Sequence, residues 1–205
     1  MLSFIKKFKK VEVALALAVF AAAIISLAGF RTACEDVRRD VLRLHVIANS
    51  DSEEDQALKL KIRDTILKEG AAVFDGTLTA DEAAEVVKPE TARLREAAER
   101  TAAENGYGYK VDVEVGEEYF DTRVYENFTM PAGRYMSVRV IIGEGKGKNW
   151  WCVMFPPLCL PAAGTEHSID AFLDDDEVRV VESSPRYEPR FKIVEIIEKV
   201  RDKWF

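Results

Sequence analysis

The sequence predicts an α+β fold: a mainly antiparallel sheet of about five strands, with helices packed on one face, preceded by an N-terminal signal or anchor helix. Three observations support this prediction. An apolar run lies within the first thirty residues, hydrophobic residues then recur with a helical period to residue 104, and from residue 109 they alternate with a period of two. With 205 residues, 48% hydrophobic and 32% charged, the chain suits one globular domain with an appendage.

The N-terminal segment, residues 1–30, has the composition of a secretory signal peptide or a membrane anchor. Four lysines among the first ten residues precede the 18-residue apolar run VALALAVFAAAIISLAGF. A helix of that length spans about 27 Å, close to the minimum for a bilayer core. Cleavage after Ala28 fits the small-x-small rule with Ser26, and an uncleaved anchor fits as well. In either case the basic flank places residues 31–205 outside the cytoplasm, as a single extracytoplasmic domain.

The exported part is strongly acidic. The whole chain has a net charge of −7, and removing residues 1–28, which hold four lysines and Glu12, takes the charge to −10. Such a surface repels phosphates, which argues against nucleic acid and anionic lipid as partners of the domain. A protein or a small molecule is the better expectation, and contact with the membrane is expected only through the N-terminal segment.

Residues 41–48 are predicted to form a strand, followed by a helix. In VLRLHVIA, the four apolar residues at even positions share one face, and Arg43, His45 and Ile47 share the other. Apolar residues spaced four apart then predict a helix over residues 52–69, which Gly70 ends.

Two further helices are predicted before residue 105. Thr79, with Glu82 three residues on, is a capping box that opens the first of them. Pro89 interrupts the helical pattern and predicts a break near Lys88. The helical period then resumes over residues 90–104.

Four strands and a terminal helix complete the predicted fold. The strands are expected at residues 109–115, 119–126, 134–143 and 149–155, the last as a central strand because it is continuously apolar. Residues 143–149 are expected to form a hairpin loop, and the acidic residues 174–177 a solvated loop. The terminal helix, residues 191–204, places four apolar residues on one stripe: Ile193, Ile197, Val200 and Trp204.

The densest polar run, RLHVIANSDSEEDQALKLKIRD at residues 43–64, combines helix-start signals with residues that helix formation does not explain. Ser50, Asp51 and Ser52 are N-cap formers, and the three acidic residues that follow favour the positive end of the helix dipole. Capping leaves over four side chains, which are expected to form an exposed recognition surface: Arg43, His45, Asn49 and Gln56.

Established catalytic and metal motifs do not match this sequence. NSDSEED lacks the glycine and the final glutamate of an EF-hand loop, so no metal site is predicted. GEGKGKN has neither the spacing nor the Ser or Thr of a phosphate-binding loop, and no cofactor is predicted. The chain is not expected to be an enzyme. The alternatives are a secreted cell-wall hydrolase using His45, Asp51 and Cys152, and an extracytoplasmic small-molecule binding module.

The second motif-rich stretch, around residue 152, leaves two questions open. Cys152 and Cys159 lie seven residues apart around a double-proline turn, so a disulfide and a pair of buried thiols are both compatible with the spacing. Trp150 and Trp151 point to opposite faces of their strand, so either one of them anchors a partner or both lie in the core.

Three stretches closely resemble the stage II sporulation protein R family of endospore-forming bacteria: LRLHVIANSDSEEDQALKLKIRD, WWCVMFPPLC and FKIVEIIEKV. The resemblance covers essentially the whole chain after the export segment, which the family also has. It implies a signalling protein without catalysis of its own, made in the forespore and exported into the space between the forespore and mother-cell membranes. There it is expected to activate a membrane-embedded aspartic protease of the mother cell, which processes a sporulation sigma-factor precursor.

The motif positions are expected to include the partner-binding residues, although the resemblance does not say which of them touch the protease. These positions are Arg43, His45, Asn49, Ser50, Asp51, Asp55, Gln56, Trp150 and Trp151. Nothing is carried over to residues 75–105, where no family motif is matched.

Overall fold

A computed structural model describes residues 2–74, 79–125, 128–156, 173–181 and 189–204. Its helices are α1 (Leu2–Asp40), α2 (Glu53–Ala71), α3 (Ala80–Val87), the short 3₁₀ helix η1 (Lys88–Glu90), α4 (Thr91–Glu104), α5 (Asp175–Val181) and α6 (Pro189–Trp204). Its strands are β1 (Leu42–Ile47), β2 (Val111–Phe120), β3 (Arg123–Val124), β4 (Thr129–Met130), β5 (Gly133–Ile142) and β6 (Asn149–Phe155). The predicted α+β class is confirmed.

In the described part of the chain, four strands form one sheet in the order β2-β5-β1-β6. β2 pairs antiparallel with β5 and β6 antiparallel with β1, whereas the two central strands, β1 and β5, are parallel. β3 and β4 form a separate two-stranded ribbon. The sheet is therefore smaller than the five strands expected, and it is mixed at its centre.

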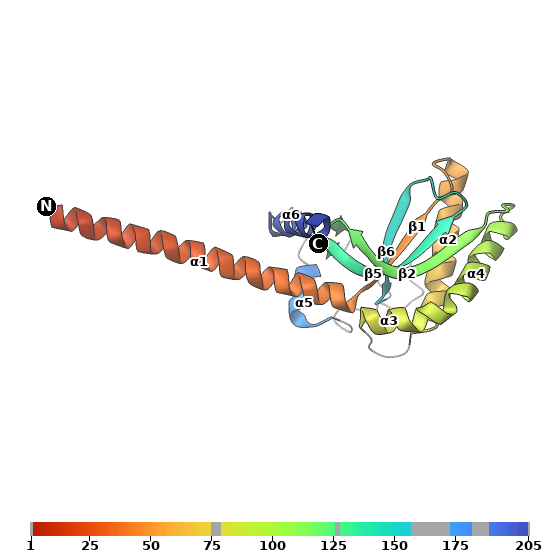
Figure 1. Ribbon diagram of the computed structural model, residues 1–205, viewed down its shortest axis with the longest axis horizontal. Helices are drawn as coiled ribbons and strands as arrows, with labels where there is room; N and C mark the ends of the chain where they lie inside the picture. Colours follow the sequence, from red (N-terminus) through yellow and green to blue (C-terminus); the bar gives the residue numbers. More distant parts are fainter. Residues whose placement is uncertain (1, 75–78, 126–127, 157–172, 182–188, 205) are drawn as a thin grey trace.

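One face of the sheet, which we call the helix-covered face, packs against α2, α3 and α4 (Figure 1). Leu44 and Val46 of β1 are fully buried there with Ile62 of α2 and Leu94 of α4. The predicted capping box is present, because Thr79 accepts a hydrogen bond from the backbone of Glu82 and the Glu82 side chain accepts one in return. The apolar periods of strands and helices thus meet in one core.

On the opposite face of the sheet, which we call the second face, the described residues cover only part of the area. The end of α1, together with α5 and the β3–β4 ribbon, buries Phe120, Tyr135 and Val153 in a second apolar cluster. Towards the other end of the strands, Glu114 is exposed and Arg139 and Ile141 are half-buried. Polar side chains therefore lie between a small core and an open surface.

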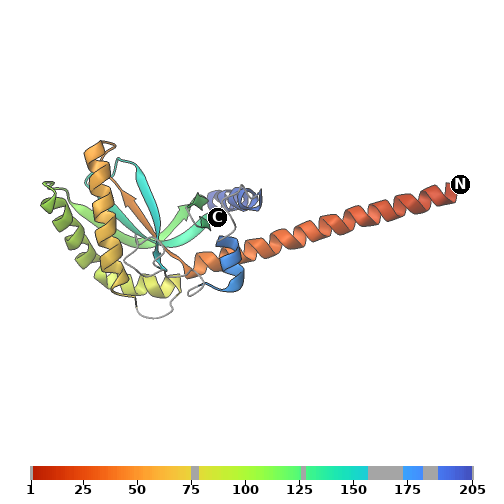
Figure 2. The same cartoon turned by 180° about the vertical axis from the view of Figure 1, so that it is seen from behind.

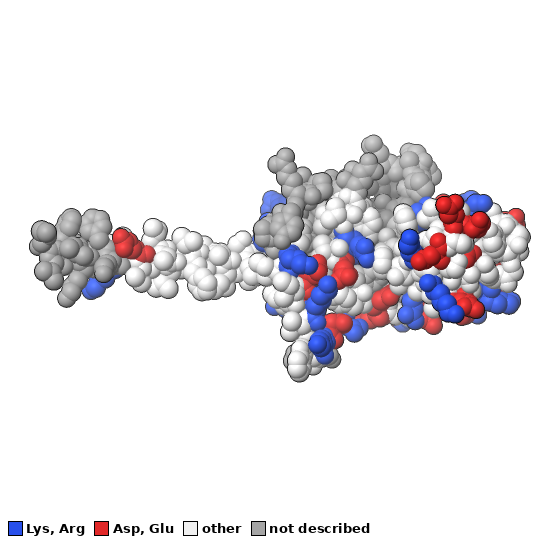
Figure 3. Space-filling model, turned by 90° about the horizontal axis from the view of Figure 1, so that it is seen from above, with Lys and Arg blue, Asp and Glu red and all other residues white. Residues whose placement is uncertain are grey.

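The helix α1 projects far from the domain and then becomes part of it (Figures 1 and 2). It contains a segment long and apolar enough to cross a membrane, with a mean hydropathy of 2.5 and 6% of it buried. Figure 3 shows this projecting part as a stretch almost free of charged residues. From Phe30 onward the helix is packed: Phe30, Cys34 and Val37 are all buried. The expected cleavage after Ala28 falls just before this packed part.

Two strand predictions and one loop prediction are wrong. Residues 119–126 do not form a separate strand of the sheet, because β2 continues through Gly116 to Phe120 and only the short β3 follows. Strand β6 lies at the edge of the four-stranded sheet and is not central. Its apolar run is explained by the burial of Cys152 to Phe155, whose side chains alternate between the two faces. Residues 143–149 are not a hairpin loop, because β5 and β6 lie on either side of β1 and the loop crosses the end of that strand.

One prediction near the C-terminus is also wrong, and another is confirmed. The acidic run 174–177 begins the helix α5 and buries Glu177, whose backbone amide donates to Asp174 Oδ1 at 2.9 Å. The predicted terminal helix is confirmed as α6. It buries Phe191, Val194 and Glu198, and leaves Ile193, Val200 and Trp204 of the apolar stripe exposed.

Candidate functional site

The imidazole of His45 is held on several sides on the second face, in a group that we call the His45 cluster: His45, Glu118, Asn149 and Trp151. Its Nδ1 donates to Glu118 Oε1 at 2.8 Å, and its Nε2 lies 3.0 Å from Asn149 Oδ1. The ring stacks on Trp151 with 5.4 Å between ring centroids and an interplanar angle of 16°. Because partners on β2 and β6 hold it from both sides, the orientation of the ring is fixed by the sheet itself.

The accessible part of the His45 cluster is its edge, which we call the rim: Asn149, Trp151 and the neighbouring Arg123. His45 is only 6% exposed, so the expectation that it lies on an exposed surface is wrong. Asn149 is exposed and Trp151 half-buried, and the guanidinium of Arg123 lies 3.8 Å from the centroid of the Trp151 ring. A partner would therefore meet Asn149, Arg123 and Trp151 first, with His45 behind them.

Glu118 supplies the negative charge of the His45 cluster. Burial alone would raise its pKa, but the hydrogen bond and charge of His45, with the Ser137 hydroxyl and Arg139, outweigh burial and lower it. The Ser137 hydroxyl donates to Glu118 Oε2 at 3.2 Å. The carboxylate is thus kept ionised beside the imidazole, an arrangement suited to presenting a fixed polar pattern.

Arg43, the other polar residue of β1, is completely buried, contrary to the expected exposed position. Its Nε donates to the carbonyl of Cys152 at 3.0 Å, and a terminal nitrogen donates to the Tyr125 hydroxyl at 2.9 Å. Its guanidinium carbon lies 4.4 Å from the ring centroid of Phe120 and 5.0 Å from that of Tyr135. The second apolar cluster covers this end of β1, so Arg43 does not contact solvent. It lies behind the His45 cluster and is bonded to β6 through the Cys152 carbonyl.

The turn after β1 starts α2 in the predicted way. Ser52 is the N-cap, and its side chain accepts a hydrogen bond from the Asp55 amide at 3.2 Å. The Asp55 carboxylate, itself buried, accepts from Asn49 Nδ2 at 2.8 Å and from the Ser50 hydroxyl at 2.5 Å. Burial raises the pKa of Asp55, and these hydrogen bonds outweigh burial and lower it. Ser50 and Asp55 therefore act inside the turn.

The same turn also carries the 143–149 loop that leads to Asn149. Asp51 Oδ1 accepts from the Lys148 amide at 2.7 Å, and Asn49 Oδ1 accepts from the Glu144 amide at 3.0 Å. Gln56, expected at the surface, donates to the Ser50 carbonyl at 2.8 Å. Through these bonds the turn fixes the loop, and the loop fixes one side of the His45 cluster.

Trp150 lies on the other side of β6, as predicted from alternation. It is 36% exposed, and the guanidinium of Arg63 lies 4.6 Å from the centroid of its ring. Trp150 and Trp151 therefore belong to different surfaces, and only Trp151 joins the His45 cluster.

The hydrolase group proposed from the sequence is not assembled. Cys152 is buried in the core of the helix-covered face, whereas His45 points to the second face, and the Asp51 carboxylate is engaged by the 143–149 loop. Cys152 takes part in a disulfide. Its predicted partner, Cys159, lies outside the described residues.

Sequence reasoning missed Glu118, Asn149 and Arg123. Glu118 lies outside the predicted strands, because the predicted alternation of residues 109–115 stops before Gly116, whereas β2 continues to Phe120. Continuing the period of two through that glycine would have placed Glu118 on the same face as Asp112 and Glu114. Its pairing with His45 depends on β5 lying between β2 and β1, and no local pattern shows that order.

The fold and the site define a class of protein. It has an α+β domain that follows an apolar N-terminal helix, and polar side chains are held in fixed positions on the second face of its sheet. The chain belongs to the stage II sporulation protein R family, whose model matches residues 38–164. That range includes β1, the turn after it and every member of the His45 cluster.

A curated relative, stage II sporulation protein R of Bacillus subtilis (strain 168), is 37% identical over 118 residues. The alignment covers 58% of this chain and 53% of the relative, so the chain matches about half the length of that protein. No solved structure matches the chain significantly.

Proposed function

We propose that this chain is an exported sporulation signal protein that binds and activates a membrane-embedded aspartic protease, which then processes a sigma-factor precursor. The proposed place of action is the space between the forespore and mother-cell membranes. Family membership and the apolar N-terminal segment of α1 support the proposal. The proposed binding surface is the rim of the His45 cluster together with Asp51 and the 143–149 loop.

The observation that carries this proposal is the fixed geometry of the His45 cluster beside an uncovered part of the second face. Burying hydrogen-bonded polar groups such as the His45 imidazole and the Glu118 carboxylate costs desolvation energy, and two apolar side chains would fill the same space without that cost. The arrangement makes sense where its rim, with Asn149 and Trp151, must present hydrogen-bonding groups in fixed positions. A rigid, partly desolvated surface with an aromatic and an arginine is typical of binding hot spots.

The test is reconstitution of the full chain in vesicles with the membrane protease and its precursor substrate. We expect His45→Ala and Asp51→Asn each to lower the rate of precursor processing about tenfold, equal to about 1.4 kcal/mol of binding free energy. His45→Ala removes the ring that orders the cluster, and Asp51→Asn weakens the acceptor that holds the loop.

The matched control is Asp64→Asn on α2, an exposed aspartate that pairs with Arg63 away from the second face. It should leave processing unchanged. Each variant should also keep the wild-type far-ultraviolet circular dichroism and co-float with vesicles. Normal processing by folded, membrane-bound His45→Ala and Asp51→Asn chains would contradict the proposed binding surface.

A further inference from the structure

The helix α6 has an apolar stripe that no described residue of the domain covers. We define the α6 stripe as Ile193, Ile196, Val200 and Trp204. Their exposed fractions are 41%, 54%, 55% and 73%. The residues recur at three- and four-residue steps, so they form one continuous strip along the helix. A contiguous exposed apolar surface of this kind marks an interaction site.

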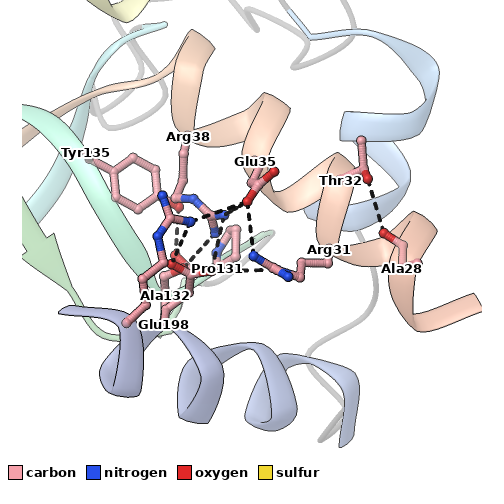
Figure 4. A network of polar contacts seen from close by, with 10 residues as sticks. Ala28, Arg31, Thr32, Glu35, Arg38, Pro131, Ala132, Tyr135 and Glu198 are labelled. Atoms are coloured by element: carbon pink, nitrogen blue, oxygen red, sulfur yellow. Dashed lines mark hydrogen bonds and ion pairs between the residues drawn. The ribbon is translucent and has the colours of Figure 1, made fainter. Parts of the chain in front are cut away.

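The other side of α6 is held against α1 by polar contacts of Glu198, which Figure 4 shows, and by an aromatic contact. Glu198 Oε1 lies 3.7 Å from the Arg38 guanidinium and 3.9 Å from Arg31 Nε. The Phe30 and Phe191 rings meet edge to face, with 5.0 Å between centroids. The helix is thus held against α1 within the first turns after the apolar run ends at Phe30.

The direction of the α6 stripe follows from helix geometry. Asp202 forms an ion pair with Arg134 of β5 at 2.8 Å, so its side of α6 faces the domain. At about 100° per residue, Ile193 lies on the opposite side of the helix from Asp202, and Val200 and Trp204 lie close to that direction. The stripe therefore faces away from the strands, and Figure 1 shows that α6 lies beside α1 where its projecting part begins.

We propose that α6 is an interfacial helix whose stripe is buried in the surface of the same lipid bilayer that α1 crosses. This inference rests on the membrane role of residues 1–30 in the proposed function. A helix that lies beside the end of a membrane-spanning segment, with an exposed apolar stripe on the side away from its own domain, is placed at headgroup level. The tryptophan at its end suits that level, because indole rings favour the membrane–water interface.

The charge of α6 fits this position although the chain as a whole is acidic. The helix has five basic and three acidic residues, whereas the full chain has a net charge of −7. A locally basic amphipathic helix is attracted to anionic headgroups at short range. The domain would then meet the membrane at two places, departing from the expectation that only the N-terminal segment does so.

The experiment uses the full chain in phosphatidylethanolamine–phosphatidylglycerol vesicles, with and without bromine on the lipid acyl chains. We expect brominated lipid to quench part of the tryptophan emission of the wild-type chain. Trp204→Phe should remove the larger part of this quenched emission. Trp150→Phe, a matched change at an exposed tryptophan beside Arg63 and away from α6, should leave it in place.

A second pair of variants tests the stripe without altering a tryptophan. Val200→Glu should reduce the quenching of Trp204, because it places a charge in the buried strip. Val124→Glu, at a valine of β3 with a similar exposed fraction of 60%, should leave the quenching unchanged. Both positions are exposed, so the fold should tolerate either change.

Three outcomes would overturn the proposal. In the first, the chain co-floats with vesicles but Trp204 is not quenched by brominated lipid. In the second, Trp204 is shielded from aqueous iodide yet still unquenched by lipid, which assigns the stripe to a second protein chain. In the third, the chain does not co-float, which removes the anchor as well. Normal precursor processing without Trp204 quenching would refute this inference alone, and quenching without processing would refute only the proposed function.

Discussion

The two faces of the sheet are built from the same four strands and differ in almost every other respect. The helix-covered face is aliphatic and closed, with Leu44, Val46 and Ile62 fully buried beneath three helices. The second face buries Arg43 completely and His45 almost completely, and only part of it is covered. The first face is what a stable domain needs, whereas the second holds polar groups that stability alone does not require.

This difference separates residues that stabilise the fold from residues that are expected to serve binding. Alternation along β1 sends Leu44 to the first face and His45 to the second, one residue apart. Changes on the helix-covered face should therefore reduce stability first. Changes on the second face should reduce partner activation more than stability.

The largest expected effect is on the helix-covered face. Ile62→Ala should lower the free energy of unfolding by about 2–5 kcal/mol, because it opens a cavity in a closed core. The measurement is urea denaturation followed by circular dichroism. The matched change on the second face, Ile141→Ala, removes a half-buried side chain and should cost less than about 1 kcal/mol. Equal losses would show that the two faces contribute equally to stability.

A smaller effect, of opposite sign, is expected where α5 helps to cover the second face. Burial, together with nearby Asp40 and Asp174, raises the pKa of Glu177 from 4.5 to about 7. The folded state therefore holds this proton more tightly than the unfolded chain, and stability falls as pH rises from about 4.5 to about 7. Glu177→Gln should stabilise the chain by about 1–2 kcal/mol at pH 8 and leave it unchanged below pH 4.5.

Thermal unfolding of Glu177→Gln at pH 4 and at pH 8 measures this difference. Asp176→Asn is the control, since the neighbouring Asp176 is exposed and pairs with Arg179 at the surface. It should shift the melting temperature equally at both pH values. A Glu177→Gln chain that gains no stability at pH 8 would show that the buried carboxyl is well accommodated when ionised.

The smallest change in stability is expected for Arg43→Met. One terminal nitrogen of Arg43 is buried without a hydrogen-bond partner in the described part of the chain, so its charge is incompletely compensated. An apolar side chain of similar length should leave the free energy of unfolding within about 1 kcal/mol of wild type. Arg43→Ala should cost about 2 kcal/mol or more, because it leaves a cavity between Phe120 and Tyr135.

The rate of precursor processing tests the same contrast between the two faces. The Arg43→Met chain should be as stable as wild type and still activate the protease less, because the support behind the His45 cluster is gone. If stability falls by several kcal/mol, the charge of Arg43 serves the fold and the contrast between the two faces weakens.

Much of the fold could be predicted because it is local. The α2 start at Ser52, the capping box at Thr79 and the break at Lys88 each depend on residues within one helical turn, and each is confirmed. The helix-covered face was also predictable, since a period of two or 3.6 identifies its members without knowledge of their partners. The burial of Arg43 and His45 could not be foreseen, because the groups that cover them come from distant parts of the chain.

The terminal helix also shows that a local pattern does not predict which residues are buried. Its stripe of Ile193, Val200 and Trp204 has the pattern of a core-facing surface, and the structure leaves it exposed. Periodicity shows that a helix has an apolar face, but the docking of the helix decides which face is buried. Here Glu198 and Phe191 dock onto α1, so a more polar side of α6 is the one that packs.

The apolar N-terminal segment, the starts of α2 and α3, the alternation of β1 and the family motifs follow from the sequence alone, because these features depend on near neighbours. Only the tertiary structure decided that β5 separates β2 from β1, that the 143–149 loop crosses the end of β1, and that Glu118 and Asn149 hold His45 from opposite sides. The physical reason is that strand order and helix docking are settled by the free energy of whole surfaces. No short stretch of residues contains that information.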